Sequence, residues 1–161
     1  MSVLQLVPAV DADFGWLLDP RTEHPRGLRV PPGGVEAAPV LSRLRQVANK
    51  VRLRHSPGMW LMVVEREIVG LIGYKLAPDA EGRVEIGYGV AASRQQRGHC
   101  TQAVAQVVRI AEQDGKIHLL YAETTVANQP SQKLLRANGF QQTATREDVE
   151  DGALFCWSRA V

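Results

Sequence analysis

The chain has 161 residues, and its 19 Lys and Arg against 17 Asp and Glu leave a formal net charge of +2 at pH 7. Its 45% hydrophobic and 22% charged residues are typical of one ordinary globular domain and argue against disordered, collagen-like and coiled-coil classes. So small a net charge gives no support for a nucleic-acid partner, and a chain of this length folds without needing a disulfide or a metal.

Three further features of the sequence limit the class of protein: its cysteines, its histidines and its apolar stretches. Cys100 and Cys156 form neither a disulfide framework nor the paired spacing of a zinc site, and the four histidines lack metal spacing. Residues 1–10 lack a positively charged start, and no apolar stretch approaches the roughly 18 residues of a membrane span. We therefore expect a cytoplasmic protein without a metal site or a membrane partner.

The first third of the chain predicts a strand, two helices and a long loop between them. Apolar residues at 3–6 indicate the strand, and Asp11 and Asp13 precede an apolar stretch at 14–18 that indicates a short helix. Prolines and glycines exclude regular structure between residues 20 and 39. After this loop, four apolar residues recur at helical spacing: Val40, Leu44, Val47 and Val51.

The middle of the chain predicts a parallel crossover. Residues 60–65 and 68–76 are apolar runs that indicate a hairpin, and residues 83–90 alternate with the period of a strand. A helix follows from about residue 101 to Gly115, and residues 118–125 form a further strand. A strand, helix and strand in this order predict two parallel neighbours in one sheet.

The end of the chain predicts one more helix and a closing pair of strands. Pro130 suits a first helical position, and the helix stops at Asn138-Gly139. Residues 140–145 and 153–157 then form an antiparallel pair. The predicted fold class is α/β or α+β: a single domain with a mixed, mostly antiparallel sheet whose central parallel strand pair is flanked by helices.

Residues 94–101 lie where the strand at 83–90 leads into a helix. The first backbone N–H groups of a helix have no partner within it, and the dipole there favours anions. Gly98 allows a phosphate to approach closely, Arg97 supplies charge, and His99 and Thr101 add donors. The spacing matches neither a Walker loop nor a dinucleotide-binding loop, so the residues alone leave a diphosphate site and a plain helix entry equally open.

Several motifs in order resemble a known family. Gln95-Gln96-Arg97-Gly98-His99-Cys100 is similar to the Gln/Arg-x-x-Gly-x-Gly/Ala loop of the GNAT N-acetyltransferases, which holds the pyrophosphate of acetyl-coenzyme A. The resemblance runs from about residue 60 to 145. It extends to the subgroup that includes the ribosomal-protein N-terminal acetyltransferases through four further motifs: Glu85-Ile86-Gly87-Tyr88, Thr101 with Ala103-Val104, Asn128-x-x-Ser131 and Asn138-Gly139-Phe140.

The resemblance implies acetyl-CoA as co-substrate and a division of the chain. Residues 1–161 would be one acyl-CoA-dependent domain, with an acceptor-side segment at 1–59, a coenzyme-binding core at 60–145 and a closing strand at 146–161. It also implies a set of coenzyme contacts: main-chain atoms of Tyr88 and Val90, the loop residues Gln95, Gln96, Arg97, Gly98, His99, Cys100 and Thr101, and Asn128 with Ser131. For Asn128 and Ser131, ordinary helix capping is the alternative.

The sequence departs from the family pattern at three positions. Cys100 stands where Gly or Ala is usual, and Gln96 stands where Gly is common. Leu135 occupies the position from which a Tyr protonates the leaving thiolate in some members, so that acid is missing here. Cys100 at a helix start also raises a ping-pong route through an acetyl-cysteine, although no activating group accompanies it in the sequence.

Two carboxylates are candidates for the general base. Glu123 matches the position of the base in related N-terminal acetyltransferases, and Glu85 resembles a Glu on the preceding strand in the ribosomal-protein subgroup. The alternative for each is a strand-edge charge that faces solvent or pairs with an Arg, because strand position alone does not fix which face opens on a cleft.

We therefore expect an N-acetyltransferase that transfers an acetyl group from acetyl-CoA to a primary amine of a protein N-terminus or a small molecule. The amine would attack directly in a ternary complex. The alternatives are a non-catalytic acyl-CoA-binding module, possible as a homodimer, and an RNA-contacting protein. An RNA would bind to the basic residues of segment 40–64, which contains no acidic residue. The alternatives for this segment are a helix face exposed to solvent, or contact with an acidic acceptor or with the 3′-phosphate of coenzyme A.

Overall fold

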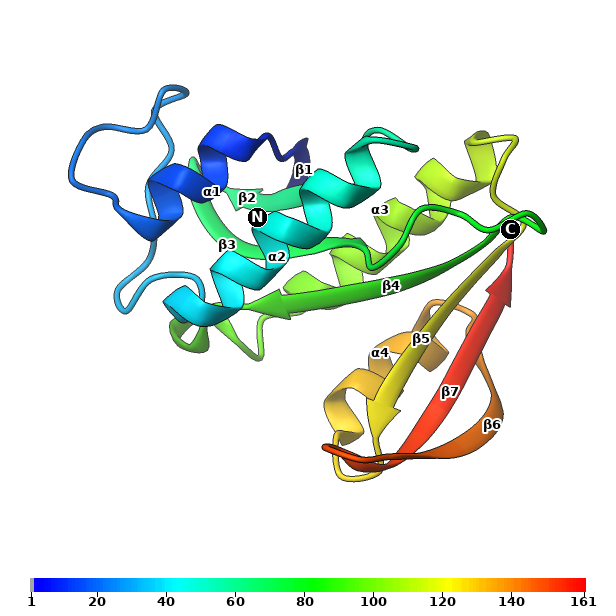
Figure 1. Ribbon diagram of the computed structural model, residues 1–161. Coiled ribbons are helices and arrows are strands. Elements are labelled where there is room, and N and C mark those ends of the chain that lie inside the picture. The colour runs from blue at the N-terminus through cyan, green and yellow to red at the C-terminus, as the bar shows by residue number, and fades with distance from the viewer. Residues whose placement is uncertain (1) are drawn as a thin grey trace.

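The computed structural model describes residues 2–161 and contains one seven-stranded sheet in the order β1-β2-β3-β4-β5-β7-β6 (Figure 1). Four α-helices and one short 3-10 turn, η1, complete the fold. In chain order the elements are β1 (Gln5–Pro8), α1 (Asp11–Leu18), α2 (Ala38–Arg52), β2 (Met59–Val64), β3 (Glu67–Tyr74), β4 (Arg83–Val90), η1 (Ala92–Arg94), α3 (His99–Gln113), β5 (Leu119–Thr125), α4 (Gln129–Ala137), β6 (Gln141–Asp148) and β7 (Gly152–Ala160).

The predicted fold class is confirmed by the pairing of the strands. Strands β1 to β4 are antiparallel neighbours, and β4 and β5 are the parallel pair joined through α3. Strand β7 pairs antiparallel with β5, and β6 pairs antiparallel with β7. The parallel register ends at Glu85↔Tyr121, well before either strand does. Beyond this point β4 and β5 diverge, and Figure 1 shows the angle that opens between them. The site is built at this opening.

The two faces of the sheet are covered by different helices. In β2, Leu61 and Val63 pack with α1 and α2, whereas Trp60 and Met62 pack into a second cluster that includes the buried face of α3. This alternation follows from the two-residue period of a strand. Helix α1 therefore packs on one side of the sheet and α3 on the other, and α2 packs mainly against α1, with Val51 at its end joining the cluster of α3.

The loop between α1 and α2 is tied down by one buried carboxylate. Asp13 bonds to His24 at 2.8 Å and to Arg26 at 2.7 Å, and both loop residues follow α1. Burial alone would raise the pKa of Asp13, but the amide of Val10 and the side chains of Arg26 and His24 together lower it. As predicted, no helix or strand of the described residues 2–161 falls between α1 and α2.

The predicted elements differ from the structure mainly at the closing hairpin. Strand β6 extends to Asp148 and β7 begins at Gly152, so the segment boundary expected at residue 146 lies inside β6. Seven of the eight residues of β6 are exposed, because it is an edge strand, and the apolar alternation that marks a half-buried strand is therefore missing there. None of the described helices has the length and apolar character of a membrane span.

Candidate active site

A cavity of about 1280 Å³ occupies the opening between β4 and β5. Its walls come from α2, β4, the loop before α3, and α4. Glu123 of β5 lines it, whereas Glu85 lies outside its lining. The structure brings the remaining sequence candidates together on this cavity: Tyr88, Val90, Gln95, Gln96, Arg97, Gly98, His99, Cys100, Thr101, Asn128 and Ser131.

One edge of β4 turns main-chain groups of Tyr88 and Val90 toward the cavity, and among these Val90 O accepts a long hydrogen bond from the side chain of Gln95 at 3.5 Å. Lys75 N donates to Glu85 O at 2.9 Å, and Ala91 N donates to Val69 O at 2.8 Å, so the odd-numbered residues of β4 face β3. Hydrogen bonding alternates along an antiparallel pair, and Tyr88 and Val90 therefore turn their N–H and C=O groups away from β3. On that side, the pairing with β5 has already ended.

Helix α3 begins without a side-chain cap. Gly98 is its N-cap residue with φ of 77°, and no acidic residue occupies the first turn. The first amide bonded within the helix is that of Gln102, which donates to Gly98 O at 3.1 Å. A Cβ built on Gly98 would meet no atom within 4 Å, so the backbone is open toward the cavity. The first-turn amides are thus available to an anion.

Three side chains shape the charge and polarity of this loop. Gln96 adopts φ of 62°, which explains why Gly is common at this position in the resembling loops. His99 has a buried Nδ1 without a hydrogen-bond partner among the described residues. Burial, followed by the charges of Arg97 and Arg94, lowers the pKa of His99 and favours the neutral imidazole. The field at the loop is positive.

Cys100 is less reactive than its place at a helix start suggests. Burial raises the pKa of the Cys100 thiol to about 11, so the thiolate is scarce near neutral pH. Direct attack by an amine needs no such nucleophile. The geometry therefore disfavours the route through an acetyl-cysteine.

The start of α4 carries a hydroxyl pair that the sequence did not reveal. Asn128 accepts a hydrogen bond from Ser131 N at 3.2 Å, which is ordinary capping, and the Ser131 hydroxyl lies 2.5 Å from that of Tyr88. Burial raises the pKa of Tyr88 to about 12 and keeps the phenol neutral. Leu135 is fully buried one turn beyond Ser131 and adds no polar group.

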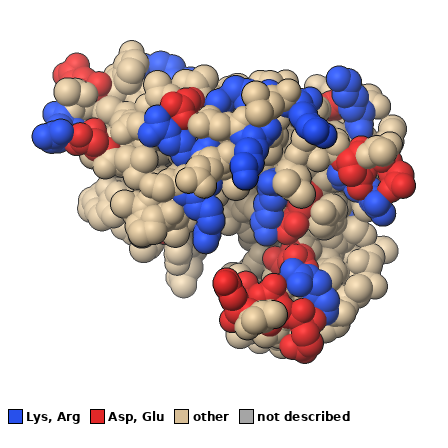
Figure 2. Space-filling model, viewed as in Figure 1, with Lys and Arg blue, Asp and Glu red and all other residues tan. Residues whose placement is uncertain are grey.

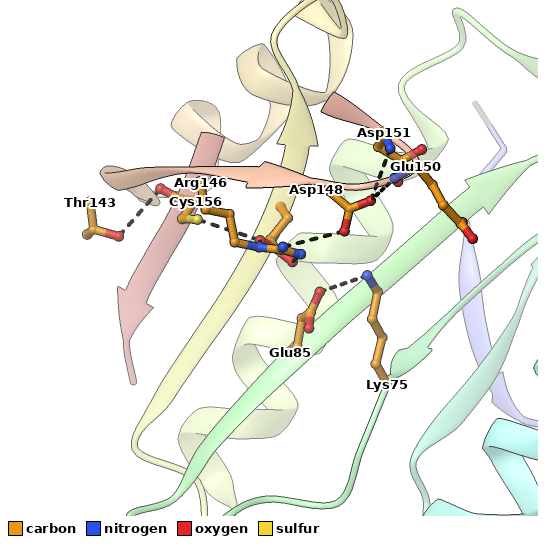
Figure 3. Close-up of polar contacts among 9 residues, drawn as sticks. Lys75, Glu85, Thr143, Arg146, Asp148, Glu150, Asp151 and Cys156 are labelled. Carbon is orange, nitrogen blue, oxygen red and sulfur yellow. Dashed lines mark hydrogen bonds and ion pairs between the residues drawn. The ribbon is translucent and has the colours of Figure 1, made fainter. Parts of the chain in front are cut away.

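Each candidate base is paired with a cation (Figure 3), and for Glu123 this is the pairing with an Arg that the sequence left open as an alternative. Glu85 binds Lys75 at 2.7 Å, and Glu123 binds Arg146 of β6 through both carboxylate oxygens. Hydrogen bonding from Arg146 is the main reason why the pKa of Glu123 lies below its usual value. No sequence pattern predicts this pair, because β6 reaches β5 only across the intervening strand β7.

The two sides of the cavity differ in charge. In Figure 2, Lys and Arg gather on the α2 side above a hollow, and Asp and Glu gather on the closing hairpin below it. From the acid-free segment, Arg43 lines the cavity, whereas Arg45 bonds to Asp11 at 2.7 Å. The hairpin carries four acids, of which Asp151 reaches the cavity: Glu147, Asp148, Glu150 and Asp151.

Sequence comparison finds a family and two distant relatives. The chain matches the acetyltransferase (GNAT) domain over residues 4–141. It is 25% identical over 107 residues to an uncharacterized N-acetyltransferase, p20, of Bacillus licheniformis, covering 65% of this chain and 60% of that protein. It is 31% identical over 83 residues to the uncharacterized N-acetyltransferase YjdG of Bacillus subtilis (strain 168), covering 50% of this chain and 49% of that protein. The matches thus span less than two thirds of each relative.

Solved structures share the fold at low identity. An acetyltransferase of Salmonella typhimurium that modifies the N-terminal serine of ribosomal protein L7/L12 superposes with a TM-score of 0.72 at 18% identity, covering 98% of this chain and 95% of that one. Mycobacterium smegmatis RimJ, solved with a CoA-disulfide, gives 0.71 at 18% identity, covering 98% of this chain and 82% of that one. With the cavity between its diverging strands and a family match across most of its length, the chain belongs to the GNAT acetyltransferase domain family.

Proposed function

We propose that this protein is an N-acetyltransferase that transfers an acetyl group from acetyl-CoA to a primary amine. The uncapped start of α3, which opens into the cavity beside the free edge of β4, is the observation that carries the proposal. A helix start with unbonded amides and no acidic side chain suits a diphosphate. A non-catalytic acyl-CoA-binding module is the second candidate, because Leu135 supplies no acid to the leaving thiolate.

The coenzyme fits the cavity in one direction. The amides of His99, Cys100 and Thr101 hold the diphosphate, with Arg97 adding charge and Gln95 and Gln96 shaping the loop. The pantetheine arm then follows β4, where main-chain groups of Tyr88 and Val90 bond to its amides. Asn128 and Ser131 line the α4 side of the same path. This direction delivers the thioester to the point where β4 and β5 part.

The reaction joins the amine nitrogen to the acetyl carbon. A neutral amine enters from the α1–α2 side, within the segment 1–59 and its surroundings, and attacks the thioester carbonyl. A main-chain N–H of β4 stabilises the negative oxygen of the tetrahedral intermediate. The C–S bond then breaks, the nitrogen loses a proton, and coenzyme A leaves as thiolate. The Tyr88–Ser131 hydroxyl pair lines the same cavity, and we assign to its second hydroxyl hydrogen the hydrogen bond to the departing sulfur.

Glu123 is the carboxylate that accepts the proton, directly or through water, because it lines the cavity and Glu85 does not. Its lowered pKa makes it a weak base. A lysine amine with a pKa near 10.4 costs about 4.6 kcal/mol to deprotonate at pH 7, whereas an α-amine near 7.8 costs about 1 kcal/mol. A weak base therefore favours an α-amine, such as a protein N-terminus, over a lysine.

An acceptor screen by mass spectrometry tests the function. The protein is incubated with acetyl-CoA and a panel of peptides with free N-termini, lysine side chains or small amines, and thiol release is followed in parallel. We expect the mass gain of one acetyl group on α-amines and equal release of thiol. Binding of coenzyme A without turnover on any amine would instead establish the non-catalytic module.

A further inference from the structure

The cavity contains more positive charge than the diphosphate and the acceptor site account for. Five Lys and Arg residues line it, and two of them are paired: Lys75 with Glu85 and Arg94 with Glu67. Within residues 2–161, no carboxylate forms an ion pair with the other three, Arg43, Arg97 and Lys133. Arg43 lies on α2 and Arg97 in the diphosphate loop, which leaves Lys133 of α4 without a role.

Helix α4 borders the diphosphate loop on the same side of the sheet. The side chain of Asn138, at the end of α4, donates to Thr101 O at 3.2 Å and so ties this end to the first turn of α3. The pantetheine arm leads away from the loop along β4. The nucleotide on the other side of the diphosphate therefore lies against the exposed face of α4.

The face of α4 that lines the cavity combines apolar side chains with one cation. Four residues of α4 line the cavity, and three of them follow helical spacing: Pro130, Lys133 and Ala137, with Leu134 beside them. Their side chains form an apolar surface that carries one cation. The neighbouring cation Arg136 is turned elsewhere, with its guanidinium 4.8 Å from the centre of the Trp157 ring. Lys133 is exposed and is the one α4 cation that lines the cavity.

We propose that Lys133 binds the 3′-phosphate of coenzyme A and makes the protein select coenzyme A over its 3′-dephospho form. This inference rests on the proposed function, since it concerns the same coenzyme. An ammonium group pairs with a phosphate as a point charge without strict geometry, which suits a flexible side chain at an open rim. Among the basic residues of α2, Arg43 is the one that lines the cavity, and α2 packs against α1, whereas α4 packs against α3 beside the diphosphate loop.

Isothermal titration calorimetry with coenzyme A and 3′-dephospho-coenzyme A tests the assignment on the full chain. We expect the unmodified protein to bind coenzyme A about 10-fold more tightly, equivalent to about 1.4 kcal/mol. Lys133→Gln should reduce this preference to less than about 2-fold and leave the affinity for the dephospho form unchanged. Lys133→Arg should keep most of the preference. Raising the salt concentration should weaken the preference only when a cation is present at position 133.

Lys50→Gln is the matched control, because Lys50 is an exposed lysine of α2 that does not line the cavity. It should bind both nucleotides like the unmodified protein. Equal binding of both nucleotides by the unmodified protein would overturn the role of Lys133 and leave the proposed function intact, as would a preference that survives Lys133→Gln. If neither nucleotide bound, the proposed function itself would fail.

Discussion

Helices α1 and α3 both start beside a loop, yet their first turns are finished in opposite ways. Helix α1 carries Asp13 at its third position, and this carboxylate accepts a hydrogen bond from Val10 N at 2.8 Å. Helix α3 carries Thr101 at the same position, and no side chain of the described residues caps its start. In α1 the Asp13 carboxylate thus satisfies the amide of the N-cap residue, whereas no carboxylate occupies the first turn of α3.

The contrast separates a structural helix start from a binding site. Asp13 is buried, holds the loop after α1 through His24 and Arg26, and offers nothing to solvent. Gly98 leaves the start of α3 open to a cavity in which Arg97 is unpaired. The backbone of the N-cap residue also differs, since Val10 is extended with φ of −112° and Gly98 is left-handed with φ of 77°.

The largest change in free energy should come from a substitution that removes the Asp13 carboxylate at the start of α1. Asp13→Asn removes the charge that faces Arg26, and we expect a loss of about 3 kcal/mol in the free energy of unfolding at pH 7. The folded pKa of Asp13 is lowered, so this stability is present above the unfolded pKa and is lost as the pH falls through the folded pKa. Urea denaturation at pH 7 and at a pH well below 3.8, the ordinary pKa of Asp, should therefore show a smaller difference between variant and parent at the lower pH.

Asp19→Asn is the control for this stability measurement. Asp19 pairs with Arg21 on the surface, so its removal should change the unfolding free energy by less than about 0.5 kcal/mol. Equal losses for the two variants would show that Asp13 does not anchor the loop.

A bulky side chain at the start of α3 should have the next largest effect, a loss of affinity for acetyl-CoA. Gly98→Val places a branched side chain at a left-handed position over the amides, and we expect the KM for acetyl-CoA to rise about 100-fold, equivalent to about 2.8 kcal/mol. Gly33→Val imposes a similar backbone strain at φ of 86° outside the cavity lining and should leave KM unchanged. An unchanged KM in Gly98→Val would show that this loop does not bind the diphosphate.

A subtler substitution converts the start of α3 into that of α1. Thr101→Asp installs the third-position carboxylate, which interacts favourably with the helix dipole and repels a diphosphate. We expect the unfolding free energy to rise by about 0.5 kcal/mol while the affinity for coenzyme A falls about 10-fold. Thr101→Asn provides the neutral control. Tighter or unchanged binding in the aspartate variant would contradict a diphosphate at this position.

The smallest effect concerns the second paired carboxylate, Glu123. Arg146 lowers the pKa of Glu123, so Arg146→Gln should raise this pKa toward its ordinary value. The acidic limb of kcat/KM against pH should then move toward higher pH. Lys75→Gln releases Glu85 instead and should leave this limb in place. A shift in the Lys75 variant alone would assign the proton to Glu85.

Local sequence signals predicted most of the fold and one part of the site. Glycine, proline and the alternation of residues 83–90 located the loop before α3 and the strand that leads into it, because these signals act over a few neighbouring residues. Pairing with an Arg was one alternative for both carboxylates, but the sequence did not identify the partner, since Arg146 meets Glu123 only across the intervening strand β7. The Tyr88–Ser131 hydroxyl pair and Lys133 likewise depend on where α4 packs.

The unbonded amides at the start of α3 can be observed individually. Titration of coenzyme A into ¹⁵N-labelled protein, followed by ¹H–¹⁵N NMR, reports on each amide. We predict the largest shifts for the amide signals of four residues, Gly98, His99, Cys100 and Thr101, and smaller shifts for those of Tyr88 and Val90. Signals at 98–101 that stay in place while coenzyme A shifts others would contradict it.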